Sequence, residues 1–200
     1  VLIDNVITDI SPIKNLAKLH TLNLSNNKLI VFPSLSGFSL LKHLDLEYNN
    51  ISIIDSVKTG TNLSFLSLRG NKIRDLSHVS DLKNLDTLYA DENLLTAAPP
   101  FSGFTNLKAL DLSNNVITDI NSLSVLSSLK YLKLNNNLIS DITPLLNLSQ
   151  IEDIKLAANE LESSDLSNLY GMKQLSNRNM KVDINGEYVY GYLDLRYNSL

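Results

Sequence analysis

Residues 19–29 read Leu19-x-x-Leu22-x-Leu24-x-x-Asn27-x-Leu29, and this frame decides the fold. The frame returns every 22 residues, and one asparagine marks each copy. The series is Asn5, Asn27, Asn49, Asn71, Asn93, Asn115, Asn137 and Asn159, followed by Asn198 after a longer gap of 39 residues. A fixed period of about 20–50 residues is typical of stacked repeat proteins, in which each repeat contacts only its neighbours.

The centre of the frame predicts a short strand in every turn. Leu22 and Leu24 alternate with polar residues, and this period of two indicates a strand with one buried face. Stacked turns would pair these strands into one parallel sheet, with about 4.8 Å between neighbours. Ala90 is the one small residue at a central leucine position.

The asparagine follows the strand, where the backbone must bend inward. Such a bend leaves buried N–H and C=O groups without partners, and an amide side chain offers both donors and an acceptor. Aspartate would offer no donor, and leucine would offer neither donor nor acceptor. The nine asparagines therefore predict a structural ladder along the inside of the coil.

The second half of each repeat predicts a short helical turn. Apolar residues recur there at three-residue spacing, as in Ile142, Leu145 and Leu148, and this spacing suits a 3-10 or α turn. Residues that favour helix N-caps stand six positions after most of the asparagines: Ser11, Asp55, Ser77, Asn121, Thr143 and Asp165. We therefore expect helical turns on the convex side of the coil and strands on the concave side.

These repeats closely resemble the leucine-rich-repeat family over essentially the whole chain. A finer signature, Ile-x-Asp-Ile-x-Pro-Leu, occurs at residues 139–145 and, ending in isoleucine, at residues 7–13. It is similar to the internalin subfamily of bacterial surface proteins, whose repeats have the same length. The resemblance implies an α/β solenoid, a right-handed coil with a parallel concave sheet. An intracellular repeat type similar to a protein phosphatase regulatory subunit is the alternative.

The unbroken period predicts one leucine-rich-repeat domain over residues 1–200. Both ends fall inside a repeat, so we expect the chain to be a piece of a longer protein. Residues 163–187 depart from the frame. They predict either an irregular insertion, with Asn185-Gly186 as a hairpin signal, or a degenerate repeat.

Composition and motifs exclude several classes of function. The net charge of −4, from 17 basic and 21 acidic residues, argues against a nucleic-acid binder. No apolar run is long enough for a membrane span, so we expect no membrane insertion in this part of the protein. No nucleophile elbow, Walker A loop or zinc protease motif occurs. We therefore expect a non-catalytic protein without cofactor or metal.

The predicted binding surface, here called the strand face, consists of the residues six, four and two positions before each asparagine. Phe65, Ser67 and Arg69 are one such set, before Asn71. The candidate binding residues are His43, Asp45, Glu47, Phe65, Arg69, Tyr89, Asp91, Asp111, Tyr131, Lys133 and Tyr192. Aromatic anchors among mixed charges are typical of protein-binding surfaces.

A protein ligand is therefore the expected partner of the strand face. The internalin resemblance implies adhesin-like recognition of a host or partner protein by a secreted or cell-surface protein. The alternative is a cytoplasmic scaffold or a subunit that regulates an enzyme.

Overall fold

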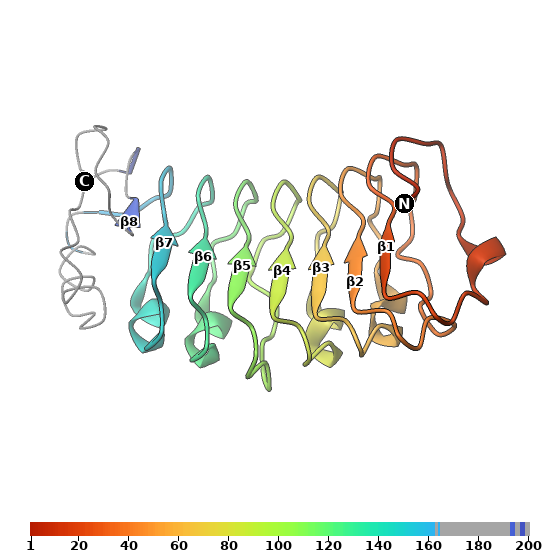
Figure 1. Cartoon of the computed structure of the whole chain (residues 1–200). Helices are drawn as coiled ribbons and strands as arrows, with labels where there is room; N and C mark the ends of the chain where they lie inside the picture. The colour runs from red at the N-terminus through yellow and green to blue at the C-terminus, as the bar shows by residue number, and fades with distance from the viewer. Residues whose placement is uncertain (163, 165–192, 195–196, 199–200) are drawn as a thin grey trace.

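The chain forms a solenoid with one parallel sheet along its side (Figure 1). The computed structural model describes residues 1–162, 164, 193–194 and 197–198. The strands follow one another in chain order: β1 (Thr21–Asn23), β2 (His43–Asp45), β3 (Phe65–Ser67), β4 (Thr87–Tyr89), β5 (Ala109–Asp111), β6 (Tyr131–Lys133), β7 (Asp153–Lys155) and β8 (Leu193–Asp194). The predicted α/β solenoid is confirmed.

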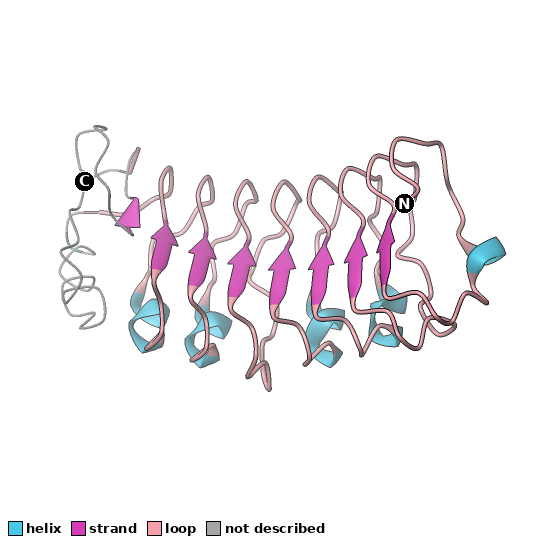
Figure 2. Cartoon of the chain, in the orientation of Figure 1, coloured by secondary structure: helices cyan, strands magenta, loops and turns pink. Residues whose placement is uncertain are grey.

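Short 3-10 helices lie away from the sheet, one before β1 and four in connections between strands (Figure 2). They are η1 (Ser11–Ile13), η2 (Asp55–Thr59), η3 (Ser77–Asp81), η4 (Asn121–Val125) and η5 (Thr143–Asn147). Each turn of the coil therefore presents one strand on one side and a helical or irregular segment on the other.

The strands pair in one register, and this register puts equivalent residues of every repeat side by side. Leu44 lies opposite Leu22 on one side and Leu66 on the other, and Leu110 opposite Leu88 and Leu132 in the same way. These leucines belong to one continuous buried core that runs through the coil. Burying a leucine side chain contributes about 1.5–3 kcal/mol, so each turn is stabilised mainly by its neighbours.

Seven of the nine predicted ladder asparagines, from Asn27 to Asn159, have buried side chains. The prediction of a place inside the coil is wrong for Asn5, which is exposed and donates to the carbonyls of Leu2 and Ile3. Asn71 is representative: its Nδ2 donates to the carbonyls of Leu68 (2.9 Å), Arg69 (3.2 Å) and, in the preceding turn, Leu46 (3.0 Å). Its Oδ1 accepts the N–H of Ile51, also in the preceding turn, at 2.9 Å. Each buried ladder asparagine therefore hydrogen-bonds backbone groups of its own bend and also links its turn to the preceding one.

The residue before each of the nine repeat asparagines, Asn5 and Asn198 included, turns the chain sharply. These residues have left-handed φ angles: Asp4, Asn26, Tyr48, Gly70, Glu92, Asn114, Asn136, Ala158 and Tyr197. Asn198 follows the last of them and keeps the ladder geometry. It accepts the N–H groups of Asn159 (3.1 Å) and Leu161 (3.2 Å) and donates to the carbonyl of Leu156 (3.0 Å).

The N-cap prediction is wrong for the five described 3-10 helices. None has a side-chain cap hydrogen bond, because the predicted cap residues lie inside the helices as their first residues. In four repeats the aspartate two positions earlier accepts the backbone N–H instead, as Asp141 does from Thr143 at 2.8 Å. The same bond joins Asp9 to Ser11, Asp75 to Ser77 and Asp119 to Asn121. This aspartate therefore orders the start of four of the five described helices, and η2 has Ile53 at that position instead.

Two turns lack a 3-10 helix and carry phenylalanines instead. Their sequences are Pro-Ser-Leu-Ser-Gly-Phe at 33–38 and Pro-Pro-Phe-Ser-Gly-Phe at 99–104. The Phe101 and Phe104 rings pack edge to face at 5.3 Å and are buried. Gly37 lies so close to the preceding turn that a Cβ atom there would be 1.9 Å from the carbonyl oxygen of Lys14. Close packing of two backbones therefore requires glycine at this position.

Some predictions fall outside the described residues. The predicted irregular segment at 163–187, apart from Ser164, lies there, as do Tyr192 and the expected cap Asp165. Within the described residues, no helix is long and apolar enough to span a membrane.

Candidate protein-binding face

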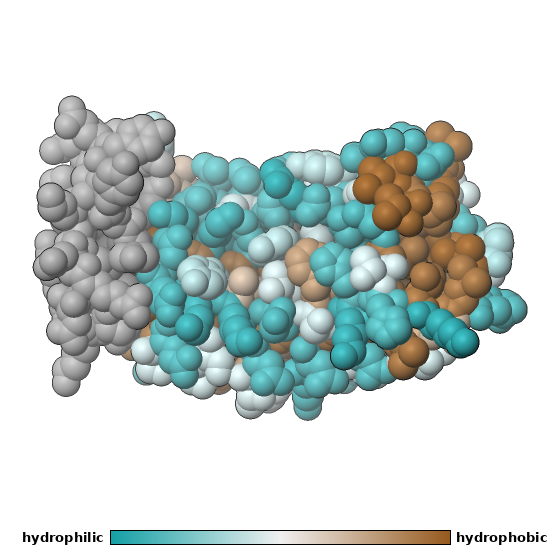
Figure 3. Space-filling model, viewed as in Figure 1, coloured by the Kyte–Doolittle hydropathy of each residue, from teal (hydrophilic) through white to brown (hydrophobic). Residues whose placement is uncertain are grey.

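The strand face consists of three rows of side chains that cross the strands. The first row is Thr21, His43, Phe65, Thr87, Ala109, Tyr131 and Asp153, and the second is Asn23, Asp45, Ser67, Tyr89, Asp111, Lys133 and Lys155. The third row is Ser25, Glu47, Arg69, Asp91, Ser113, Asn135 and Ala157. Every predicted binding residue except Tyr192 lies in these rows. Figure 3 shows that this side of the coil is largely hydrophilic, with hydrophobic residues gathered toward the N-terminal end.

An aromatic cluster crosses β2, β3 and β4. The rings of His43 and Phe65 are parallel, with centroids 3.9 Å apart. The Tyr89 ring meets Phe65 edge-on, with centroids 5.6 Å apart. All three side chains are half-buried. Such ring pairs are each stabilised by about 0.5–1.5 kcal/mol beyond the burial of their area, so the cluster is held in place before any partner arrives.

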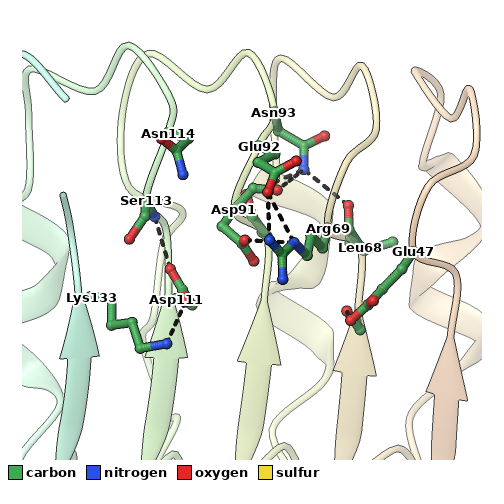
Figure 4. A network of polar contacts seen from close by, with 12 residues as sticks. Glu47, Leu68, Arg69, Asp91, Glu92, Asn93, Asp111, Ser113, Asn114 and Lys133 are labelled. Carbon is green, nitrogen blue, oxygen red and sulfur yellow. Dashed lines mark hydrogen bonds and ion pairs between the residues drawn. The ribbon is translucent and has the colours of Figure 1, made fainter. Parts of the chain in front are cut away.

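An ion-pair network lies beside the aromatic cluster (Figure 4). The guanidinium of Arg69 contacts Asp91 at 3.1 Å and Glu92 at 2.6 Å, and it lies 5.5 Å from the centre of the Tyr48 ring. The hydrogen bond to Glu92 raises the pKa of Arg69. Tyr48 and Glu92 were not predicted as site residues. They lie in the left-handed turns beyond the strands, whereas the predicted binding residues all lie at fixed strand offsets before the asparagines.

Asp91 is the most perturbed acid of the network. It points out of the coil in the third row, yet it is only 6% exposed. Burial, helped by the nearby Asp111 carboxylate, raises the pKa of Asp91 to about 6, although Arg69 acts in the opposite direction. Asp111 itself pairs with Lys133 at 3.2 Å and accepts the N–H of Ser113 at 3.0 Å. Two neighbouring carboxylates thus have cations on opposite sides.

A hollow of about 230 Å³ lies on the strand face over β5 and β6. Tyr89, Ala109, Tyr131 and the charged residues Asp111, Lys133 and Asp153 line it, together with Leu110 and Leu132. Ala109 is the smallest residue in its row, between Thr87 and Tyr131. A small residue at an outward strand position is the sequence signal for this hollow, which was not predicted.

Neighbouring residues hold the walls of the hollow. The Tyr131 hydroxyl donates to Glu152 at 3.2 Å, and Glu152 also pairs with Lys130 at 3.0 Å. Asp153 lies 3.2 Å from the ammonium of Lys155. Among the described residues, no three His, Asp or Glu side chains are grouped so that they could hold a metal ion. The strand face can therefore recognise a partner through its aromatic rings, its paired charges and the hollow over β5 and β6.

Comparison with known protein families agrees with the repeat frame. A family model described as "Leucine Rich repeats (2 copies)" matches residues 83–125, and one described as "Leucine Rich Repeat" matches residues 18–38 and 40–59. No curated protein matches the chain by sequence.

Solved structures with the same architecture include two internalins of Listeria monocytogenes. Internalin C2 is 29% identical with a TM-score of 0.78, and the match covers 86% of this chain and 75% of that one. Internalin F is 29% identical with a TM-score of 0.75, over 96% of this chain and 59% of that one. A leucine-rich-repeat protein of Leptospira interrogans is 28% identical with a TM-score of 0.75, and the match covers 80% of this chain and 43% of that one.

Proposed function

Because the chain is a leucine-rich-repeat protein that resembles the internalins, we propose that it recognises a protein partner through its strand face. Leucine-rich-repeat folds generally serve as protein-interaction modules, and a stacked coil offers an extended surface for this purpose. Within the proposal, the chain acts as an adhesin-like part of a secreted or cell-surface protein and binds a host or partner protein.

The aromatic cluster of His43, Phe65 and Tyr89 is the observation on which the proposal rests. Its rings are partly exposed yet already packed against one another, His43 stacked on Phe65 and Tyr89 edge-on to it. Aromatic anchors near the centre of an interface supply most of its binding energy. Anchors that are fixed in advance lose little conformational freedom on binding.

The charges around the aromatic cluster favour a partner protein that binds reversibly and also exists apart from this chain. Arg69 and Lys133 are paired with acids of the same face, so both cations already have partners when the face is free. The rest of the face is largely hydrophilic (Figure 3). Polar surroundings with a few aromatic anchors are characteristic of interfaces between proteins that also exist apart.

Site-directed photocrosslinking tests the proposal. A benzophenone amino acid at Thr87, in the middle of the strand face, should crosslink to the partner when the chain is mixed with solubilised surface proteins. The same group at Ser124, on helix η4, is the matched control on the other side of the coil. Mass spectrometry identifies the crosslinked protein. Equal crosslinking from both positions would contradict a strand-face site.

The identified partner then permits a quantitative test. Replacing Phe65, Tyr89 and Tyr131 together with alanine should weaken binding at least 30-fold, because each hot-spot side chain contributes about 1–2 kcal/mol or more. The control variant replaces the exposed Val125 and Leu146 of the 3-10 helices with alanine. Undiminished binding by a correctly folded triple variant would show that the strand face is not the site.

A further inference from the structure

The hollow over β5 and β6 is suited to one side chain of a partner. Its volume of about 230 Å³ lies below the range of about 300–1,000 Å³ that is usual for pockets that bind small molecules. Tyr89 and Tyr131 come from strands on either side of Ala109. The hollow is therefore flanked by two aromatic rings above a small apolar residue.

The two carboxylates of the hollow, Asp111 and Asp153, each pair with a lysine. Lys133, the partner of Asp111, lines the hollow, whereas Lys155, the partner of Asp153, does not. The side chain of Asp111 is 12% exposed and is fixed by the N–H of Ser113, whereas that of Lys133 is 56% exposed. Exposed ion pairs contribute little to stability, so an incoming cation can take the place of Lys133 beside Asp111.

We propose that this hollow receives an arginine side chain of the protein partner, with its guanidinium against the tyrosine rings and its N–H groups donating to Asp111. This proposal rests on the function proposed above and names the chemistry of one subsite. Arginine fits because its planar guanidinium both stacks on aromatic rings and donates to carboxylates. An aliphatic side chain would cover the Asp111 carboxylate without offering a donor, which is unfavourable.

A titration with small probes tests the subsite without knowledge of the partner. N-acetyl-arginine-N-methylamide is added to the ¹⁵N-labelled chain, and the amide signals of Tyr89, Ala109, Asp111 and Tyr131 are followed. We expect saturable shifts at these positions with a Kd on the order of 1 mM, as for other small fragments. The citrulline and leucine analogues should bind at least about fivefold more weakly, because neither carries a positive charge.

Two variants and one control locate the binding. Ala109→Leu fills the hollow, and Asp111→Asn removes the charge while it keeps an oxygen for the N–H of Ser113. Each should weaken the arginine probe about fivefold or more. Thr21→Leu adds the same side chain at the equivalent exposed position of β1 and should leave binding unchanged. The unchanged size and shape of Asp111→Asn keep the test valid even if Ala109→Leu disturbs the fold.

Three results would overturn the proposal: no saturable shift, equal binding of the citrulline or leucine probe, or arginine binding that neither variant weakens. These results are separable from failure of the proposed function. If the partner is lost by the triple aromatic variant but retained by Ala109→Leu and Asp111→Asn, the strand face is the site and only the arginine subsite is wrong.

Discussion

Replacing Asn115 with alanine should show how much one asparagine of the ladder contributes to the free energy of unfolding. Its Nδ2 donates to the carbonyls of Ala90 (3.1 Å), Leu112 (3.0 Å) and Ser113 (3.1 Å), and its Oδ1 accepts the N–H of Leu95 at 2.9 Å. All of these groups are in the buried part of the coil. Alanine removes all four bonds at once.

The expected loss follows from which groups keep another partner. The three carbonyls also accept bonds from Asn93, Asn137 and the N–H of Glu92, so each loses only a second bond, worth about 0.5–1 kcal/mol. The N–H of Leu95 would be left buried without an acceptor, at a cost of about 1–3 kcal/mol. Together these give a loss of about 2.5–6 kcal/mol in the free energy of unfolding.

Urea denaturation followed by far-UV circular dichroism measures this loss. Asn106→Ala is the control, because Asn106 is exposed, and it should change stability by less than about 0.5 kcal/mol. Asn115→Asp should be at least as harmful as alanine at pH 7, since a carboxylate has no donor for the carbonyls. A loss for Asn115→Ala no larger than that of the control would refute the reasoning about the ladder.

Gly37→Ala should lower the unfolding free energy by about 2 kcal/mol or more, because its Cβ would lie 1.9 Å from a backbone oxygen; unchanged thermal stability relative to Ser36→Ala would contradict this. Asp91 has a raised pKa of about 6, so the folded state holds its proton more tightly, and stability should fall as pH rises from about 4 to about 6. Asp91→Asn should remove that slope and stabilise the chain at pH 7 by on the order of 1–2 kcal/mol; an unchanged slope in urea titrations would count against it. Asp141→Ala should lower the free energy of unfolding by about 0.5–1 kcal/mol, because the bond to the N–H of Thr143 is lost. Thr143→Ala should lower it by less. A larger loss for Thr143→Ala in urea denaturation would show that Thr143 is the cap.

The repeat frame made the buried half of the molecule predictable. Leu44, Leu66 and Leu88 recur at one spacing, and an identical spacing in stacked turns can satisfy the core only in one register. Asn71 was predictable for the same reason, since a buried bend requires both donors and acceptors. The fold therefore followed from residues that the coil does not permit to vary.

The details of the strand face were less predictable, because the frame leaves its residues free. Asp91 was predicted as a binding residue of the strand face, but it is nearly buried. Glu92 and Tyr48 join the network from left-handed turns, where strand offsets give no guidance. The hollow depends on Ala109 being small beside two tyrosines, a relation between repeats that no single repeat displays.

The position of Asn198 has a consequence for engineering. It occupies the same place relative to Leu156 and Leu161 as the other ladder asparagines occupy in their turns, although 39 residues instead of 22 separate it from Asn159. The ladder position of an asparagine therefore does not require a fixed number of residues after the preceding rung. A foreign segment could be grafted between two such anchor points, so that the coil displays it while the adjoining turns keep their bonds.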